Sequence, residues 1–60
     1  MKYTGWKLLK KDNLNGLELW KTPSKFLVCQ KYLNFFRFVN SKEDAIKIFE
    51  DTLNEWAIHS

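Results

Sequence analysis

The hydrophobic period of the chain changes at Ser41, and this change constrains the fold more than any other feature of the sequence. After Ser41 the apolar residues recur at helical spacing and fall within one arc about 180° wide. They are Ala45, Ile46, Ile48, Phe49, Leu53, Trp56 and Ala57. Ser41 is a suitable N-cap, and Asp44 stands three residues later, where the acid of a capping box belongs. We therefore predict one amphipathic helix over residues 42–57.

Before Ser41 the apolar residues tend to alternate with polar ones, which is typical of β-strands. Stretches rich in strand-forming residues are separated by short turn sequences. Asn15-Gly16 and Pro23-Ser24-Lys25 are good reversals, whereas a third reversal near Leu33-Asn34 has no glycine. The predicted strands are residues 6–11, 17–22, 26–32 and 35–39.

These elements predict one small α+β domain over residues 1–60. Its architecture would be a three- or four-stranded antiparallel meander with one C-terminal amphipathic helix packed on one face. A domain of this length buries only roughly 60% of the surface that its unfolded chain exposes. A single helix covers one face of such a sheet, so the other face is left for solvent or for a partner.

The aromatic residues make the uncovered face informative, because ten of the 60 residues are Phe, Trp or Tyr. We expect one set of alternating residues to point at the helix: Leu17, Leu19, Phe26, Val28, Phe36 and Phe38. The complementary set would then lie on the open face: Trp20, Leu27, Cys29, Lys31, Phe35 and Arg37. Rings beside Lys and Arg can stack on nucleobases or anchor a protein interface. Alternatively, the rings enlarge a small core, since each aromatic side chain buries 150–250 Å².

Charge is distributed unevenly along the chain. Residues 1–41 carry eight Lys or Arg and two acids, a net charge of +6, whereas residues 42–60 carry two Lys and five acids, a net charge of −3. A basic surface attracts polyanions or acidic proteins. Lys10 and Lys11 are better explained as protection of an edge strand, because charged side chains there discourage pairing with another strand. The cations expected to contact a partner are Lys21, Lys25, Lys31 and Arg37.

Catalysis and cofactor binding are not expected. Cys29 lies in the middle of a predicted strand and His59 is the next-to-last residue, so no nucleophile with a neighbouring base is apparent. One cysteine excludes an internal disulfide, and one cysteine with one histidine cannot provide the four ligands of a structural zinc site. We expect no cofactor, no metal site and no small-molecule substrate. The apolar runs are too short for a membrane span or a signal peptide, so a cytoplasmic location is expected.

A resemblance to a known family is found where the last predicted strand meets the helix, in the segment Phe38-Val39-Asn40-Ser41-Lys42-Glu43-Asp44-Ala45. A strand that ends in Phe, a Ser or Thr cap and a helix that opens with Lys-Glu-x-Ala is similar to the close of AP2-like β-β-β-α domains. These domains bind arm-type DNA sites in phage and transposon integrases. The resemblance covers about residues 17–56 and implies a sheet that lies in the DNA major groove. It implies DNA contacts from Trp20, Lys31, Phe35 and Arg37.

Two functions follow as hypotheses for a non-enzymatic binding module. In the first, the basic sheet binds nucleic acid, with phosphate contacts from its lysines and arginine and stacking by Trp20 and Phe35. In the second, the same face binds a protein, either a second copy in a homodimer or an acidic partner. A short chain rich in Lys, Asn and Phe would suit a phage or mobile element, where inhibitors and adaptors of host proteins also occur.

Overall fold

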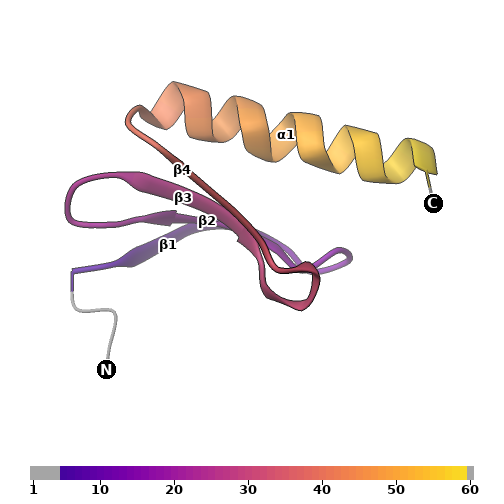
Figure 1. Cartoon of the computed structure of the whole chain (residues 1–60), viewed down its shortest axis with the longest axis horizontal. Helices are drawn as coiled ribbons and strands as arrows, with labels where there is room; N and C mark the ends of the chain where they lie inside the picture. The colour runs from indigo at the N-terminus through magenta and orange to yellow at the C-terminus, as the bar shows by residue number, and fades with distance from the viewer. Residues whose placement is uncertain (1–4, 60) are drawn as a thin grey trace.

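The structure, a computed structural model, describes residues 5–59, with side chains as far as residue 57 (Figure 1). Four strands, one turn of 3-10 helix and one α-helix follow each other along the chain. They are β1 (Lys7–Asp12), β2 (Leu17–Lys21), β3 (Phe26–Gln30), η1 (Lys31–Leu33), β4 (Phe35–Val39) and α1 (Lys42–His59). The predicted α+β meander is confirmed, in its four-stranded form. The third predicted strand ends two residues early, at Gln30, because the chain turns there into η1.

The four strands pair antiparallel in chain order, so β1 and β4 are the edges of the sheet. The pairings of β2 with β3 and of β3 with β4 are regular over their length. The pairing of β1 with β2 shifts between Leu8 and Lys10, where β1 contains one extra residue. Such a bulge bends an edge strand and interrupts its outward row of hydrogen-bonding groups.

Two reversals of the meander depend on left-handed backbone. Gly16 ends the β1–β2 loop at φ +74°, and its N–H donates to the Asp12 carbonyl at 2.7 Å. Asn34 has φ 55° after η1, and its N–H donates to the Lys31 carbonyl at 3.1 Å. Asparagine tolerates this conformation better than other non-glycine residues. The reversal near Leu33-Asn34 therefore forms without glycine.

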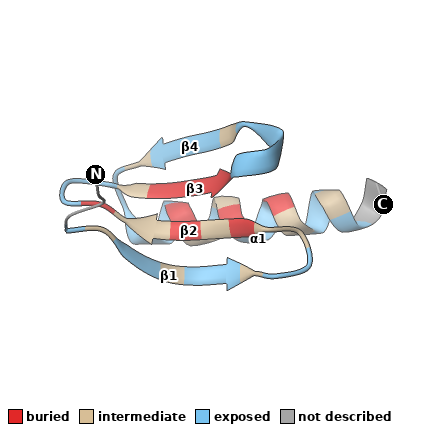
Figure 2. Cartoon of the chain, turned by 90° about the horizontal axis from the view of Figure 1, so that it is seen from below, coloured by how far each residue is buried: buried red, intermediate tan, exposed pale blue. Residues whose placement is uncertain are grey.

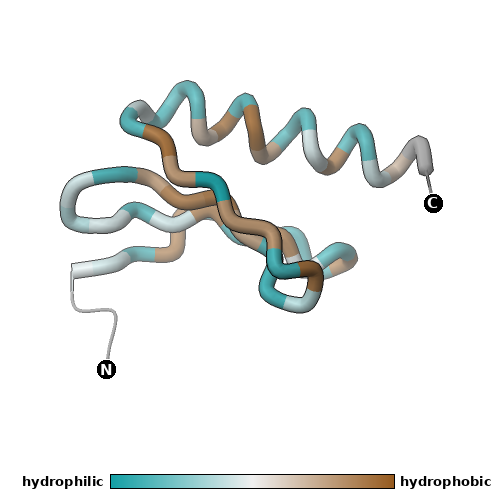
Figure 3. The backbone as a smooth tube through the Cα atoms, in the orientation of Figure 1, coloured by the Kyte–Doolittle hydropathy of each residue, from teal (hydrophilic) through white to brown (hydrophobic). Residues whose placement is uncertain are grey.

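Helix α1 begins as predicted. The Ser41 hydroxyl accepts a hydrogen bond from the Asp44 N–H at 3.0 Å, and the Ser41 carbonyl accepts the first helical bond from the Ala45 N–H at 3.1 Å. Glu43 and Asp44 lie in the first turn, where acidic side chains suit the positive end of the helix dipole. The apolar stripe of α1 faces the sheet and its hydrophilic residues lie on the outer side (Figure 3).

The core lies between α1 and the covered face of the sheet. Its buried members are Leu17, Leu19, Val28, Ala45 and Phe49. Half-buried apolar residues surround them: Leu9, Phe26, Phe35, Val39, Ile46, Ile48, Leu53 and Trp56. Burial is greatest in the two central strands, and both edge strands are largely exposed (Figure 2). The sheet face away from α1 is called the open face below.

The expected orientation of β4 is wrong. Phe35 packs against the core on the side of α1, whereas Phe36 and Phe38 lie on the open face. The register gives the reason, because Gln30 pairs with Phe35 and Val28 pairs with Arg37. Directly paired residues share a face of the sheet, so Phe35 and Arg37 follow Val28 to the covered side.

Candidate binding face of the sheet

The open face contains an apolar concavity of about 160 Å³. It spans β2, β3 and β4 and extends to the residue before β1. Its walls are formed by Trp6, Trp20, Leu27, Cys29, Lys31, Phe36 and Phe38. For scale, an apolar cavity of about 150 Å³ can hold one benzene molecule. The concavity therefore has room for one bulky apolar side chain.

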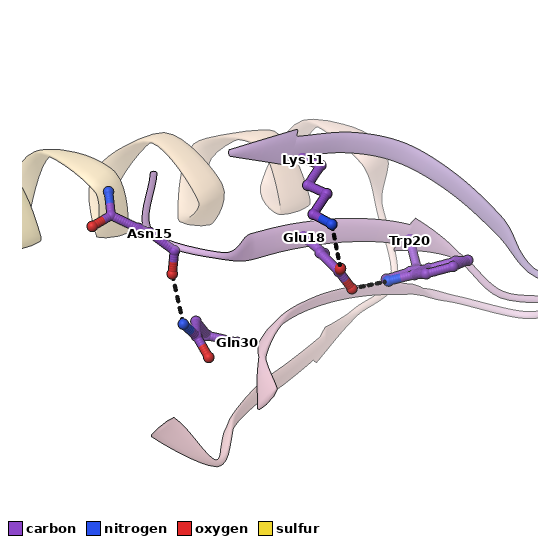
Figure 4. A network of polar contacts seen from close by, with 5 residues as sticks. All are labelled: Lys11, Asn15, Glu18, Trp20 and Gln30. Carbon is purple, nitrogen blue, oxygen red and sulfur yellow. Dashed lines mark hydrogen bonds and ion pairs between the residues drawn. The ribbon is translucent and has the colours of Figure 1, made fainter. Parts of the chain in front are cut away.

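Trp20 is held in place on the open face by a polar network (Figure 4). Its indole N–H donates to the Glu18 carboxylate at 2.9 Å, and the other carboxylate oxygen lies 3.7 Å from Nζ of Lys11. A hydrogen bond to a charged acceptor is stronger than one between neutral groups. Trp6 lies beside Trp20, with ring centroids 6.4 Å apart and ring planes at 59°. The tryptophan wall is thus fixed before any partner binds.

Phe36 and Phe38 form the opposite wall and are unusually accessible for phenylalanine. Phe36 is 44% exposed and Phe38 is 55% exposed. They pair across the sheet with Cys29 and Leu27, which lie beside them on the same face and are buried. Exposed rings at the rim of an apolar concavity are a common feature of protein-binding surfaces.

Two lysines flank these rings. Nζ of Lys25 lies 5.9 Å from the centre of the Phe38 ring, which is within the range of a cation–π contact. Lys31 borders the concavity from η1, immediately after β3. Neither lysine forms an ion pair with a carboxylate in the described part of the chain. The open face therefore has an apolar centre and a positive rim beside Phe38 and η1, whereas on the β1 side the Glu18 carboxylate is ion-paired with Lys11.

The structure brings together only some of the predicted site residues. Trp20, Lys25 and Lys31 lie on or beside the open face. Lys21 pairs with Phe26, so it lies on the covered side, where its Nζ is 5.4 Å from the Phe26 ring and donates to the Thr22 carbonyl.

Phe35 and Arg37 also lie on the covered side, at the β4 edge. The Arg37 guanidinium lies 4.8 Å from the centre of the Phe35 ring and donates to the Phe36 carbonyl at 3.2 Å. Arg37 remains exposed, so it is accessible along the edge of the sheet. Its place is therefore the rim between the two faces rather than the open face itself.

Sequence reasoning missed Trp6, Phe36 and Phe38 as members of this surface. For Trp6 the sequence carries only the alternation, and the structure supplies the register, in which Leu8 pairs with Trp20 and Trp6 precedes Leu8 by two residues. Alternation then places Trp6 on the face of Trp20. Phe36 and Phe38 carried no comparable signal, since β4 has large apolar residues on both of its faces.

Cys29 is the thiol that lines the concavity. Burial raises the pKa of its thiol above the ordinary value of 9.0, the Glu18 carboxylate raises it further, and Lys31 opposes both effects. The protonated thiol is a weak nucleophile. Among the described residues no group of three or more His, Cys, Asp or Glu is arranged to hold a metal ion. The side chain of His59 lies outside the described residues.

Comparison with known proteins gives no relative. No protein-family model matches the sequence, and neither a curated protein nor a solved structure matches it significantly. Within the described residues, α1 is not apolar enough to cross a membrane. The geometry of the open face is thus the main guide to function.

Proposed function

We propose that this protein is a non-enzymatic binding module that recognises another protein through its open face. The observation that supports the proposal most directly is the apolar concavity between the tryptophan wall and the Phe36–Phe38 wall. Trp, Phe and Arg are enriched in the cores of protein interfaces, whereas charged residues collect at the rim. The open face has this distribution.

The size of the concavity indicates which part of a partner it can bind. Its volume of about 160 Å³ suits one aromatic or branched aliphatic side chain from a partner. Trp20 and Trp6 already contact each other, and Glu18 fixes the Trp20 indole. Walls that are ordered before binding reduce the entropy that a partner must overcome.

Nucleic-acid binding, as the AP2-like resemblance implies, is the second candidate. It is favoured by residues 19–42, which contain five Lys or Arg and no acid. The cations are, however, divided between the two sides of the sheet, and Lys25 and Lys31 are those beside the open face. Two phosphate contacts give only a shallow salt dependence, because each neutralised phosphate contributes roughly one unit to the slope. We therefore favour a protein partner.

A displayed library of random peptides of about ten residues tests the proposal. Peptides that bind the protein should be enriched, and their affinity should fall about tenfold or more with Phe38→Lys, which places a charge at the wall of the concavity. Leu14→Lys is the matched control, because Leu14 is 90% exposed in the β1–β2 loop. It should leave binding unchanged.

Duplex DNA of random sequence, measured at two salt concentrations, separates the two candidates. Weak or absent binding to DNA is expected. The proposal is overturned if no enriched peptide depends on Phe38. It is replaced by the nucleic-acid function if DNA binds with a steep salt dependence that Lys25→Ala and Lys31→Ala reduce.

A further inference from the structure

The two edges of the sheet differ in how they are protected against pairing with another strand. β1 carries Lys7, Lys10 and Lys11 and contains the bulge near Leu8. Lysines and bulges are the usual means by which an edge strand avoids pairing. The β4 edge has neither feature.

β4 is a regular and apolar edge strand. Its pairing with β3 runs through five consecutive residue pairs without a bulge, and in the described part of the chain β4 pairs with β3 alone. Four of its five residues are apolar, namely Phe35, Phe36, Phe38 and Val39. The exposed Arg37 guanidinium reaches the Phe36 carbonyl, so this backbone acceptor can be reached from outside the sheet. A strand of this kind can accept another strand beside it.

The charge around β4 indicates the chemistry of such a strand. Lys25 lies over the Phe38 ring, Lys31 precedes β4, and Arg37 lies at its centre. None of the three forms an ion pair with a carboxylate among the described residues. Because residues 19–42 contain no acid at all, an approaching acidic segment meets only positive charge on this part of the chain.

We propose that the β4 edge accepts an extended, acidic segment of the partner protein as a fifth strand. This proposal rests on the proposed function and specifies the partner that the surface takes. The added strand would place apolar side chains beside Phe36 and Phe38 on the open face. It would place a carboxylate near Arg37, whose guanidinium leaves the Phe36 carbonyl when the strands pair. Backbone hydrogen bonds supply affinity, and alternate side chains supply specificity.

A second copy of this chain fits the edge poorly. Antiparallel pairing of β4 with its own copy about the middle of the strand sets Arg37 opposite Arg37, and like charges directly opposite each other are unfavourable. The acids of the chain lie in α1, in the central strand β2 and at the end of β1. A copy therefore has no free acidic strand to offer.

Hydrogen exchange of the backbone amides tests the inference with the peptides selected as above. Enriched peptides should be acidic with alternate apolar residues, and their binding should slow the exchange of β4 amides but not of β1 amides. Methylation of alternate peptide nitrogens should abolish binding, because it removes donors that strand pairing needs. Arg37→Glu should weaken binding about tenfold, whereas Lys7→Glu on the β1 edge should change it less than twofold.

The possible outcomes separate this inference from the proposed function. One outcome is that peptide binding depends on Phe38, but the peptides do not slow the exchange of β4 amides and bind Arg37→Glu as tightly as the wild type. This outcome would overturn the fifth strand and leave the proposed binding by the open face standing. Absence of any peptide that depends on Phe38 would overturn the proposed function. A dimer in sedimentation whose β4 amides are protected without peptide would assign the edge to a second copy instead. Arg37→Gln repeats the test if the charge reversal disturbs folding.

Discussion

Phe35 lies edge-on to Trp56 of α1, with ring centroids 5.9 Å apart and ring planes at 71°. This arrangement is a favourable geometry for two aromatic rings. The contact joins the β4 edge to the C-terminal part of α1. Both rings lie at the border of the core, around its fully buried residues. Because Phe35 faces the helix, Phe36 and Phe38 must face away from it. The same contact thus supports the core and leaves two phenylalanines on the open face.

Phe35→Ala should destabilise the protein more than Phe38→Ala. Phe35 is half-buried against Trp56, so its removal leaves a gap in the core and should cost about 2–3 kcal/mol, somewhat less than a fully buried Phe. Phe38 is 55% exposed, so its truncation should cost less than about 1 kcal/mol. Urea unfolding of both variants measures the difference. Equal losses would contradict the orientation of β4.

The sequence was sufficient for the architecture because several local signals agreed. The helical period after Ser41, the Ser41 cap and the turn at Asn15-Gly16 each predicted the element that the structure shows. Consistent local preferences are a property of sequences that fold to one structure. The helix continues to His59, two residues past the predicted end.

The candidate site was harder to predict because it depends on register. Alternation shows which residues of β4 share a face, but not which face that is. A change of one residue in the β3–β4 connection exchanges the two faces. That connection comprises η1 and Asn34, and no glycine marks its length in the sequence. Phenylalanines on both sides of β4 removed hydrophobicity as a guide, so Phe35 was placed wrongly while Trp20 was placed correctly.

Gln30 joins two reversals of the meander, and its replacement should destabilise both. Its Nε2 donates to the Asn15 carbonyl at 2.6 Å (Figure 4), and its Oε1 accepts hydrogen bonds from the Tyr32 and Leu33 N–H groups at 2.6 and 3.3 Å. Gln30→Leu removes all three bonds in a buried position and should lower the free energy of unfolding by about 2 kcal/mol.

Gln30→Glu is the matched variant for the same position. Its carboxylate can still accept from the two η1 N–H groups, but it cannot donate to the Asn15 carbonyl. Thermal unfolding at neutral pH should show a loss for both variants. Hydrogen exchange should show Leu33 less protected in Gln30→Leu than in Gln30→Glu. Identical exchange at Leu33 in the two variants would argue against the role of Oε1.

Removal of the N-cap of α1 should lower the stability of the protein. Ser41→Ala removes the hydroxyl that accepts from the Asp44 N–H and should cost about 1 kcal/mol. Ser41→Asp keeps an acceptor and adds a negative charge at the positive end of the helix dipole, so its stability should equal or exceed that of the wild type. Urea midpoints of the three proteins give the comparison. A Ser41→Asp variant as unstable as Ser41→Ala would exclude capping as the cause.

Cys29 should make stability fall at alkaline pH. Burial, aided by the Glu18 carboxylate, raises the pKa of the folded thiol above the ordinary value of 9.0 that it regains on unfolding. Below that value both states hold the proton, so the thiol contributes no pH dependence. Above it the unfolded state loses the proton first, and rising pH favours unfolding until the folded thiol also ionises.

Cys29→Ala isolates this effect, because the two proteins differ in no other ionisable side chain. Urea unfolding between about pH 7 and pH 10 should show a loss in the wild type that exceeds that of Cys29→Ala by up to about 1 kcal/mol. The slopes are compared rather than the absolute values, since the truncation also removes a buried sulfur atom. Parallel curves for the two proteins would show that the folded thiol ionises as readily as the unfolded one and would contradict the raised pKa of Cys29.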